Sequence, residues 1–99
     1  MRRIHLASSF DAEFLALAAH IKECFGGRVA LEFADSFSQL AQALADTPGL
    51  GKTNHGFPTI LYAVVFRTNW LFYRFTNDEI EFLHIRSGRM QKEDHWFEA

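Results

Sequence analysis

Cysteine is nearly absent from the 99-residue sequence, which contains only Cys24. A single thiol cannot form a disulfide within the chain, so a small disulfide-stabilised secreted domain is excluded. The one cysteine and five scattered histidines lack the ligand spacing of a metal site, and neither a metal nor another cofactor is expected. Because Cys24 falls within an apolar helical pattern, we expect it to lie in the core or at its boundary.

Long hydrophobic runs are also absent. The longest, residues 60–66, has seven residues and is too short to span a bilayer. The apolar stretch after the two N-terminal arginines is too short for the core of a signal peptide. We therefore expect a soluble, cytoplasmic protein. The length favours one domain, residues 1–99, and eleven phenylalanines favour a folded core over disorder.

The chain has no excess of positive charge. Its formal net charge is −2, and residues 9–46 alone hold six acids against two bases, which gives 2 − 6 = −4. Residues 52–99 hold six bases and six acids, and so are neutral. Binding of nucleic acid requires Lys and Arg to neutralise phosphates, so this balance disfavours an obligate nucleic-acid binder. The helical region is expected to present an acidic outer surface.

Apolar spacing predicts a short strand at residues 3–7 and then two helices. In the first helix Ser8 and Asp11 form a candidate capping box, and five apolar residues share one face: Phe10, Phe14, Leu17, Ile21 and Phe25. Gly26-Gly27 ends this helix and forces an antiparallel hairpin. The second helix is expected from about residue 28 to 45, with one apolar stripe of Phe33, Phe37, Leu40 and Leu44.

The second half of the chain has the composition of strands. After a loop at residues 49–58, β-branched and aromatic runs predict strands at 59–66, 70–75 and 79–86, joined by tight turns. The first of these is apolar on both faces and is expected to be central. The alternation shifts between Phe82 and Leu83, which indicates either a β-bulge or a strand buried on both sides. The fold class is therefore α+β, with the helical hairpin packed on one face of an antiparallel meander.

Within the second half of the chain, positive charge is concentrated at the end of the last strand and just beyond it. His84 and Arg86 are two residues apart and share a face, as a general base and a phosphate clamp for RNA cleavage would. The alternative is that both are solvent-facing positions alternating with apolar ones. Arg89 and Lys92 would grip a phosphate or an acidic partner, or else form a charged edge that discourages aggregation.

The expected contacts of three further residues follow from the sequence around them. Arg74, within an aromatic strand, is a candidate to bind the target or a phosphate, and the favoured alternative is that it pairs with Glu81 or Glu79 across the next turn. Trp96 and Phe97 are too apolar to remain in water, so they are expected to dock on the sheet or on a partner.

The order of elements and three segments resemble the RelE/ParE superfamily of toxins from bacterial type II toxin–antitoxin systems. "TPGLGK" at residues 47–52 is similar to the family's post-helix segment, "LFYRF" at 71–75 to its penultimate strand, and "FLHIRSGR" at 82–89 to its last strand. Arg74 and Arg89 stand at positions that match the family motif. Two positions depart from it: Asn69-Trp70 replaces a Tyr-Arg pair whose arginine holds the scissile phosphate in the nucleases, and Ser87 replaces a histidine.

The resemblance implies a growth-inhibiting toxin of a plasmid-stabilisation system. A cognate antitoxin would neutralise it by adding a helix and a strand, and the assembly would be a homodimer or a heterotetramer with the antitoxin. Because the catalytic set is incomplete and the charge disfavours RNA, we favour a ParE-like toxin that binds a protein target such as DNA gyrase and is not an enzyme. The alternatives are a RelE-type ribosome-dependent endoribonuclease acting on messenger RNA, and a non-toxic member that only binds its partner.

Overall fold

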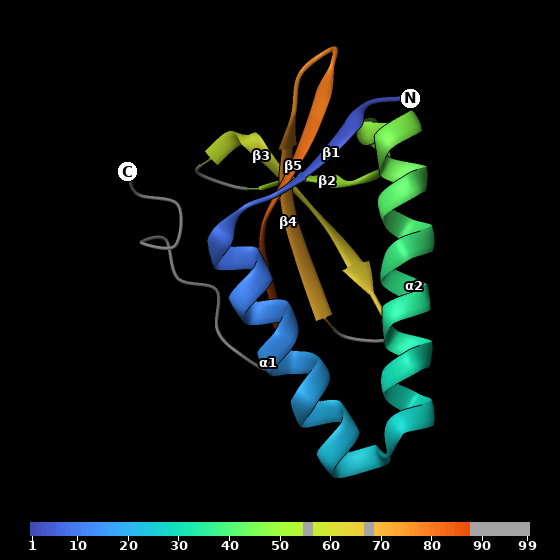
Figure 1. Cartoon of the computed structure of the whole chain (residues 1–99). Helices are drawn as coiled ribbons and strands as arrows, with labels where there is room; N and C mark the ends of the chain where they lie inside the picture. The colour runs from blue at the N-terminus through green and yellow to red at the C-terminus, as the bar shows by residue number, and fades with distance from the viewer. Residues whose placement is uncertain (55–56, 67–68, 88–99) are drawn as a thin grey trace.

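The computed structural model describes residues 1–54, 57–66 and 69–87. Its helices are α1 (Ser8–Phe25) and α2 (Gly27–Asp46), followed by a short 3-10 helix, Pro48–Leu50. Its strands are β1 (Arg3–Leu6), β2 (Lys52–Asn54), β3 (Phe57–Val65), β4 (Asn69–Phe75) and β5 (Glu79–Ser87) (Figure 1). Within the described part of the chain, neither helix is long and apolar enough to cross a membrane.

The strands form one sheet in the order β1-β5-β4-β3-β2. β1 is parallel to β5, and the other neighbouring pairs are antiparallel. The predicted α+β class and the meander β3-β4-β5 are confirmed. β3 is an inner strand, as predicted, because it pairs with both β2 and β4, although β4 holds the middle place. The prediction that β3 is buried on both faces is wrong at Val64, which is 54% exposed.

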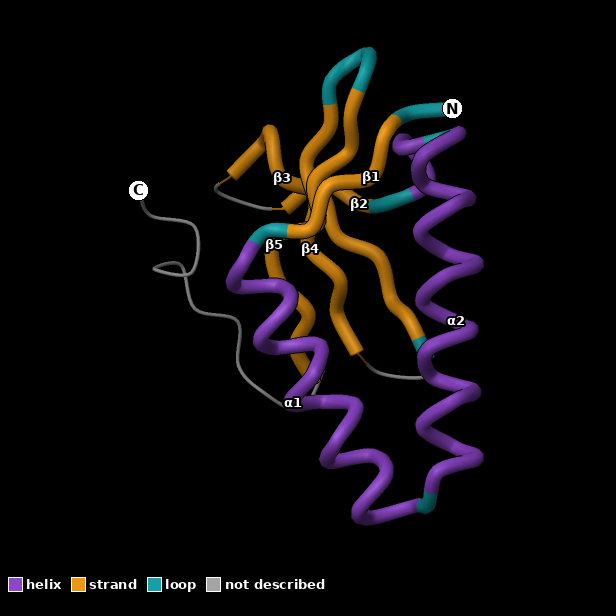
Figure 2. The backbone as a smooth tube through the Cα atoms, viewed as in Figure 1, coloured by secondary structure: helices purple, strands orange, loops and turns teal. Residues whose placement is uncertain are grey.

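Both helices cover the same face of the sheet. In Figure 2, α1 and α2 meet at the hairpin and diverge along the strands. Their inward side chains and those of β3, β4 and β5 form a single apolar core, whose buried members are Phe10, Ile21, Phe33, Ala41, Leu44, Ala45, Val65, Leu71, Tyr73, Ile80, Phe82 and Ile85. The rings of Phe10 and Phe37 lie 5.2 Å apart, within the range in which aromatic pairs add to the stability of a core. The predicted stripe of α2 is confirmed.

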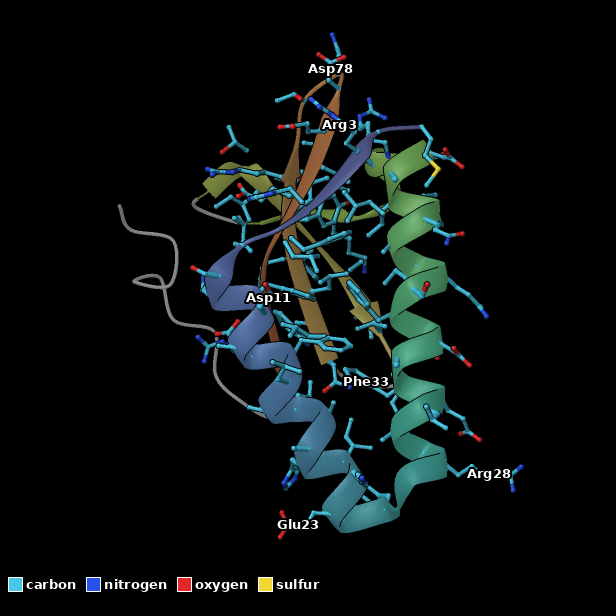
Figure 3. All side chains as sticks on the ribbon, in the orientation of Figure 1. Arg3, Asp11, Glu23, Arg28, Phe33 and Asp78 are labelled. Atoms are coloured by element: carbon cyan, nitrogen blue, oxygen red, sulfur yellow. The ribbon has the colours of Figure 1, made fainter. Side chains whose placement is uncertain are left out.

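The stripe of α1 is confirmed except at its last residue. Phe25 is 64% exposed, because it lies at the hairpin tip, where the helices extend past the strands. Cys24 is exposed at the same tip, so its predicted core position is wrong. Gly26 turns the chain there with φ of 95°, a value that glycine adopts without a steric penalty. The sticks in Figure 3 show Glu23 and Arg28 pointing outward near this tip, while Phe33 points inward from α2.

The predicted capping box is absent. α1 begins at Ser8 itself, and its N-cap residue, Ala7, makes no side-chain capping bond. The Ser9 hydroxyl instead donates to the Leu83 carbonyl of β5 at 2.8 Å. The Ser9 side chain therefore ties the start of this helix to β5 instead of capping its free N–H groups.

The loop expected at residues 49–58 contains more regular structure than predicted. Residues 48–50 form the 3-10 helix, residues 52–54 form β2, and β3 begins at residue 57. The hydroxyl of Tyr73 holds the start of this segment by donating to the Pro48 carbonyl and accepting from the Gly51 N–H at 3.0 Å. Burial raises the pKa of Tyr73, an effect that the hydrogen bond from Gly51 partly opposes.

The predicted β-bulge at Phe82–Leu83 is confirmed. Phe72 pairs with His84 and Tyr73 pairs with Phe82, so Leu83 is the extra residue on β5. Beyond the bulge, Ile85 points into the core, and His84 and Arg86 stand opposite Phe72 and Trp70. The bulge therefore turns His84 and Arg86 toward the face opposite the helices, which we call the helix-free face.

Candidate functional site

One carboxylate joins the first helix to the end of the last strand. Glu13 of α1 accepts hydrogen bonds from three consecutive residues of β5. The His84 Nδ1 lies 3.0 and 3.2 Å from its two oxygens, and the Ile85 backbone N–H donates to Oε1 at 3.2 Å. The Arg86 Nη2 forms an ion pair with Oε2. Because a carboxylate can only accept, the His84 Nδ1 carries the proton.

The path of the chain explains why Glu13 reaches this place. β1 pairs with β5 only as far as Leu6 and Phe82. Beyond that point the Ala7 N–H donates to the Phe82 carbonyl at 3.0 Å, and the Ser9 hydroxyl donates to Leu83. Glu13 follows about one turn later and accepts from Ile85. The first turns of α1 thus satisfy the backbone groups of β5 that β1 leaves without a neighbouring strand.

The cluster of Glu13, His84 and Arg86 is largely shielded from water. The side chains are 18%, 12% and 25% exposed, respectively. Charge-assisted hydrogen bonds of this kind are stronger than neutral ones, and in such an enclosed position solvent screens them little. The guanidinium and the imidazole are therefore held in one orientation, and the charge of the guanidinium is compensated by Glu13 within the protein.

Aromatic side chains occupy the helix-free face beside this cluster. The rings of Tyr62 and Trp70 stack at 5.1 Å with an angle of 12° between their planes. Trp70 stands in register between Val64 and Arg86, and Phe72 stands between Tyr62 and His84. Trp70, at the departure from the family motif, therefore supplies a stacked aromatic surface instead of a phosphate-binding cation.

Arg74 belongs to a separate charged row nearer the β4–β5 turn. Its Nε and Nη2 each lie 2.7 Å from Oε1 of Glu81, so the predicted pairing with Glu81 is observed. His5 of β1 lies 3.4 Å from the other Glu81 oxygen. The row borders an open pocket of about 430 Å³, lined by His5, Arg74, Phe75, Thr76, Glu79 and Glu81. Three paired rows of β4 and β5 lie between Arg74 and the row of Arg86, so the structure does not place the two arginines in one site.

The structure brings His84 and Arg86 together as predicted, but through a residue that the sequence did not single out. Glu13 was expected on the acidic outer surface, and that expectation is wrong for this residue. The available signal was its position in α1, flanking the apolar stripe one turn from Phe10 and Leu17. The predicted Arg89, Lys92, Trp96 and Phe97 lie outside the described residues. Within residues 1–54, 57–66 and 69–87, no group of three or more His, Cys, Asp or Glu side chains is arranged to hold a metal ion.

Comparison with known families gives a match along most of the chain. The family model described as the ParE toxin of the type II toxin–antitoxin system, parDE, matches residues 4–92. No curated protein sequence matches the chain.

Solved structures show the same fold at low sequence identity. A structure described as the chromosomal ParDE TA system from P. aeruginosa superposes with a TM-score of 0.73 at 18% identity, covering 88% of this chain and 96% of that one. The conserved hypothetical protein HP0894 from Helicobacter pylori superposes with a TM-score of 0.54 at 17% identity, covering 90% of this chain and 97% of that one. YafQ from E. coli strain BL21(DE3) superposes with a TM-score of 0.55 at 14% identity, covering 90% of this chain and 96% of that one.

Proposed function

The chain belongs to the ParE toxin family of type II toxin–antitoxin systems, and from this premise we propose that it arrests growth by binding a protein target such as DNA gyrase. A cognate antitoxin holds it inactive. The observation that carries the choice of a protein target is the ion pair of Arg86 with Glu13. A cation already compensated inside the protein is poorly placed to stabilise the charge of a phosphate in a transition state.

The helix-free face also supports a protein target. Trp, Tyr and Arg are the residues most enriched where protein interfaces derive their binding energy. Trp70, Tyr62 and Arg86 lie together on this face, beside the exposed Val64. This combination suits a partner that brings apolar and hydrogen-bonding groups. The net charge of −2 gives no long-range attraction for RNA.

An antitoxin as binding partner is supported by the family match and by the exposed edge strand β1. The structural relative from P. aeruginosa is described as a ParDE system, which couples a toxin to an antitoxin. All four residues of β1 are exposed, including the apolar Ile4 and Leu6. An extended partner segment adds readily to such an edge strand.

Expression in a bacterial host tests the proposal. Induction is expected to arrest growth while messenger RNA stays intact, and co-expression of the product of an adjacent small reading frame is expected to relieve the arrest. Purified protein is then added to a gyrase supercoiling assay, where loss of supercoiling identifies the target. Normal supercoiling alongside growth arrest would reject gyrase and retain another protein target.

The second candidate is a ribosome-dependent endoribonuclease of RelE type. It is favoured by one observation: His84 and Arg86 lie on the same side of β5, with the imidazole held by a carboxylate. Such an enzyme would produce ribosome-dependent cuts in transcripts, and His84→Ala or Arg86→Ala would abolish them. A non-toxic member of the family would instead bind the antitoxin tightly without arresting growth.

A further inference from the structure

We propose that Glu13 is a specificity-determining residue, whose carboxylate keeps the end of β5 from binding nucleic-acid phosphates. The inference rests on the proposed function, because it explains how a chain with cations at this strand end remains selective for a protein. It concerns a residue of α1 that lies 71 positions from His84 in the sequence.

The first step of the argument is geometric. The Glu13 carboxylate already occupies the place where a phosphate would have to lie to accept from His84, Ile85 and Arg86 together. A phosphate and a carboxylate compete for the same donors, because both are acceptor groups that match the fork of a guanidinium. Any phosphate that approaches Arg86 must therefore displace Glu13 or bind beside its negative charge.

The second step concerns the energetic role of the cluster. Enclosing a carboxylate and a guanidinium costs both groups much of their hydration, and the attraction between them only partly recovers this cost. An apolar contact between α1 and β5 would hold the two elements together as well. Retaining charge here is more readily explained by selectivity than by stability.

The third step is a comparison with another acid on the helical hairpin. Glu32 forms an exposed pair with Arg28 one turn away on α2, and its side chain is 57% exposed. Its charge is screened by water and does not lie against β5. Glu32 therefore has the same formal charge as Glu13 without its contacts, which makes it a matched control.

Binding of a fluorescein-labelled oligouridine, followed by fluorescence anisotropy over a salt series, tests the proposal. Glu13→Gln is close to isosteric, and its amide oxygen can still accept from Ile85. At low salt this variant is expected to bind about tenfold more tightly than the wild type. The slope of log K against log salt concentration is expected to be steeper by about 0.7, because one further cation is released to pair with a phosphate. Glu32→Gln changes the net charge equally, from −2 to −1, and should stay within about twofold of the wild type, since its charge is screened.

Two further variants complete the test. Glu13→Gln combined with Arg86→Gln is expected to return to wild-type binding, because the released cation has been removed. Glu13→Asp keeps the formal charge but draws the carboxylate back by one methylene, so it should tighten binding even if Glu13→Gln fails to fold. The proposal is overturned if Glu13→Gln and Glu13→Asp bind the oligonucleotide no better than Glu32→Gln.

This failure would be distinguishable from a failure of the proposed function. Transcript cleavage by the wild-type protein in cells would reject the protein-binding toxin, whatever the anisotropy shows. Growth arrest with intact messenger RNA, together with equal oligonucleotide binding by the Glu13 and Glu32 variants, would reject only the role of Glu13.

Discussion

Tyr73 and Gly51 are in direct contact across the fold: the Gly51 N–H donates to the Tyr73 hydroxyl at 3.0 Å. The same hydroxyl donates to the carbonyl of Pro48, in the 3-10 helix. One buried side chain of the central strand β4 thus fixes the segment that leads from α2 into the sheet. Its ring also packs against Phe82 of β5, with the ring centres 6.2 Å apart.

Replacing Tyr73 with Phe is expected to lower the free energy of unfolding by about 1–3 kcal/mol. The ring would keep its packing, but the carbonyl of Pro48 and the N–H of Gly51 would lose their buried partner. Urea denaturation measures the change. Tyr62→Phe is the control, because the Tyr62 hydroxyl makes no hydrogen bond among the described residues, and an equal loss in both variants would contradict the role assigned to the Tyr73 hydroxyl.

Stability should also depend on pH through Tyr73. Because burial raises its pKa in the folded state, the folded protein retains this proton at pH values where the unfolded chain has lost it. The stabilisation is fully present below the ordinary tyrosine pKa of about 10 and is lost as the pH rises from there through the folded-state value. Urea titrations on both sides of that pH should show a smaller alkaline loss for Tyr73→Phe than for the wild type. An equal alkaline loss of stability in both proteins would contradict a raised pKa of Tyr73 in the folded state.

Gly51→Ala is expected to destabilise the fold by about 1–3 kcal/mol, the usual range for overpacking. An added Cβ at this position would lie 2.1 Å from the Tyr73 hydroxyl and 2.9 Å from the Tyr62 backbone carbonyl. Gly49→Ala is the matched control, since its Cβ would meet no atom within 4 Å. Thermal unfolding of the two variants side by side gives the comparison, and equal melting temperatures would show that Tyr73 moves aside without cost.

Glu13→Ala is expected to lower the free energy of unfolding by about 2–4 kcal/mol, because it leaves a largely enclosed guanidinium without its carboxylate. Glu32→Ala, which removes an exposed partner of Arg28, should cost no more than about 0.5 kcal/mol. Chemical denaturation of both variants provides the measurement. Comparable losses would mean that the enclosed cluster contributes no more than a surface ion pair.

Phe33→Ala is expected to cost about 3–5 kcal/mol, since it would leave a cavity under α2. Phe25→Ala should change stability by no more than about 0.5 kcal/mol, because the ring at the hairpin tip is already mostly in water. Both are measured by urea denaturation. A large loss at Phe25 would indicate that the exposed tip is covered in solution, for example by a second molecule.

The order of elements could be predicted from the sequence because hydrophobic periodicity reports which side of an element is buried. The same principle located the bulge at Leu83, where alternation shifts by one residue. It failed at Phe25 because periodicity identifies a helical face but not where the partner sheet stops. β2 was not predicted, because its three residues form a strand by pairing with β3 and have no strong strand preference of their own.

The candidate site was predictable only in part. His84 and Arg86 are neighbours in one strand, so their shared side followed from local geometry. Glu13 lies on another element, and single-sequence reasoning has no means to bring together residues that far apart. Its place flanking the apolar stripe of α1 was compatible with either a solvated or an inward-turned carboxylate, and the position of α1 against the edge of β5 decides between them.

The pairing of β1 with β5 has a consequence for synthesis of the protein. The first strand finds its neighbour only in the last described strand, and the Ser9 hydroxyl bonds to a carbonyl 74 residues later. At translation rates of about 5–20 residues per second, the N-terminal strand waits several seconds before β5 emerges. The nascent chain therefore cannot assemble its complete sheet until β5 has been synthesised, so the N-terminal strand stays without its neighbour for most of the synthesis of residues 1–87.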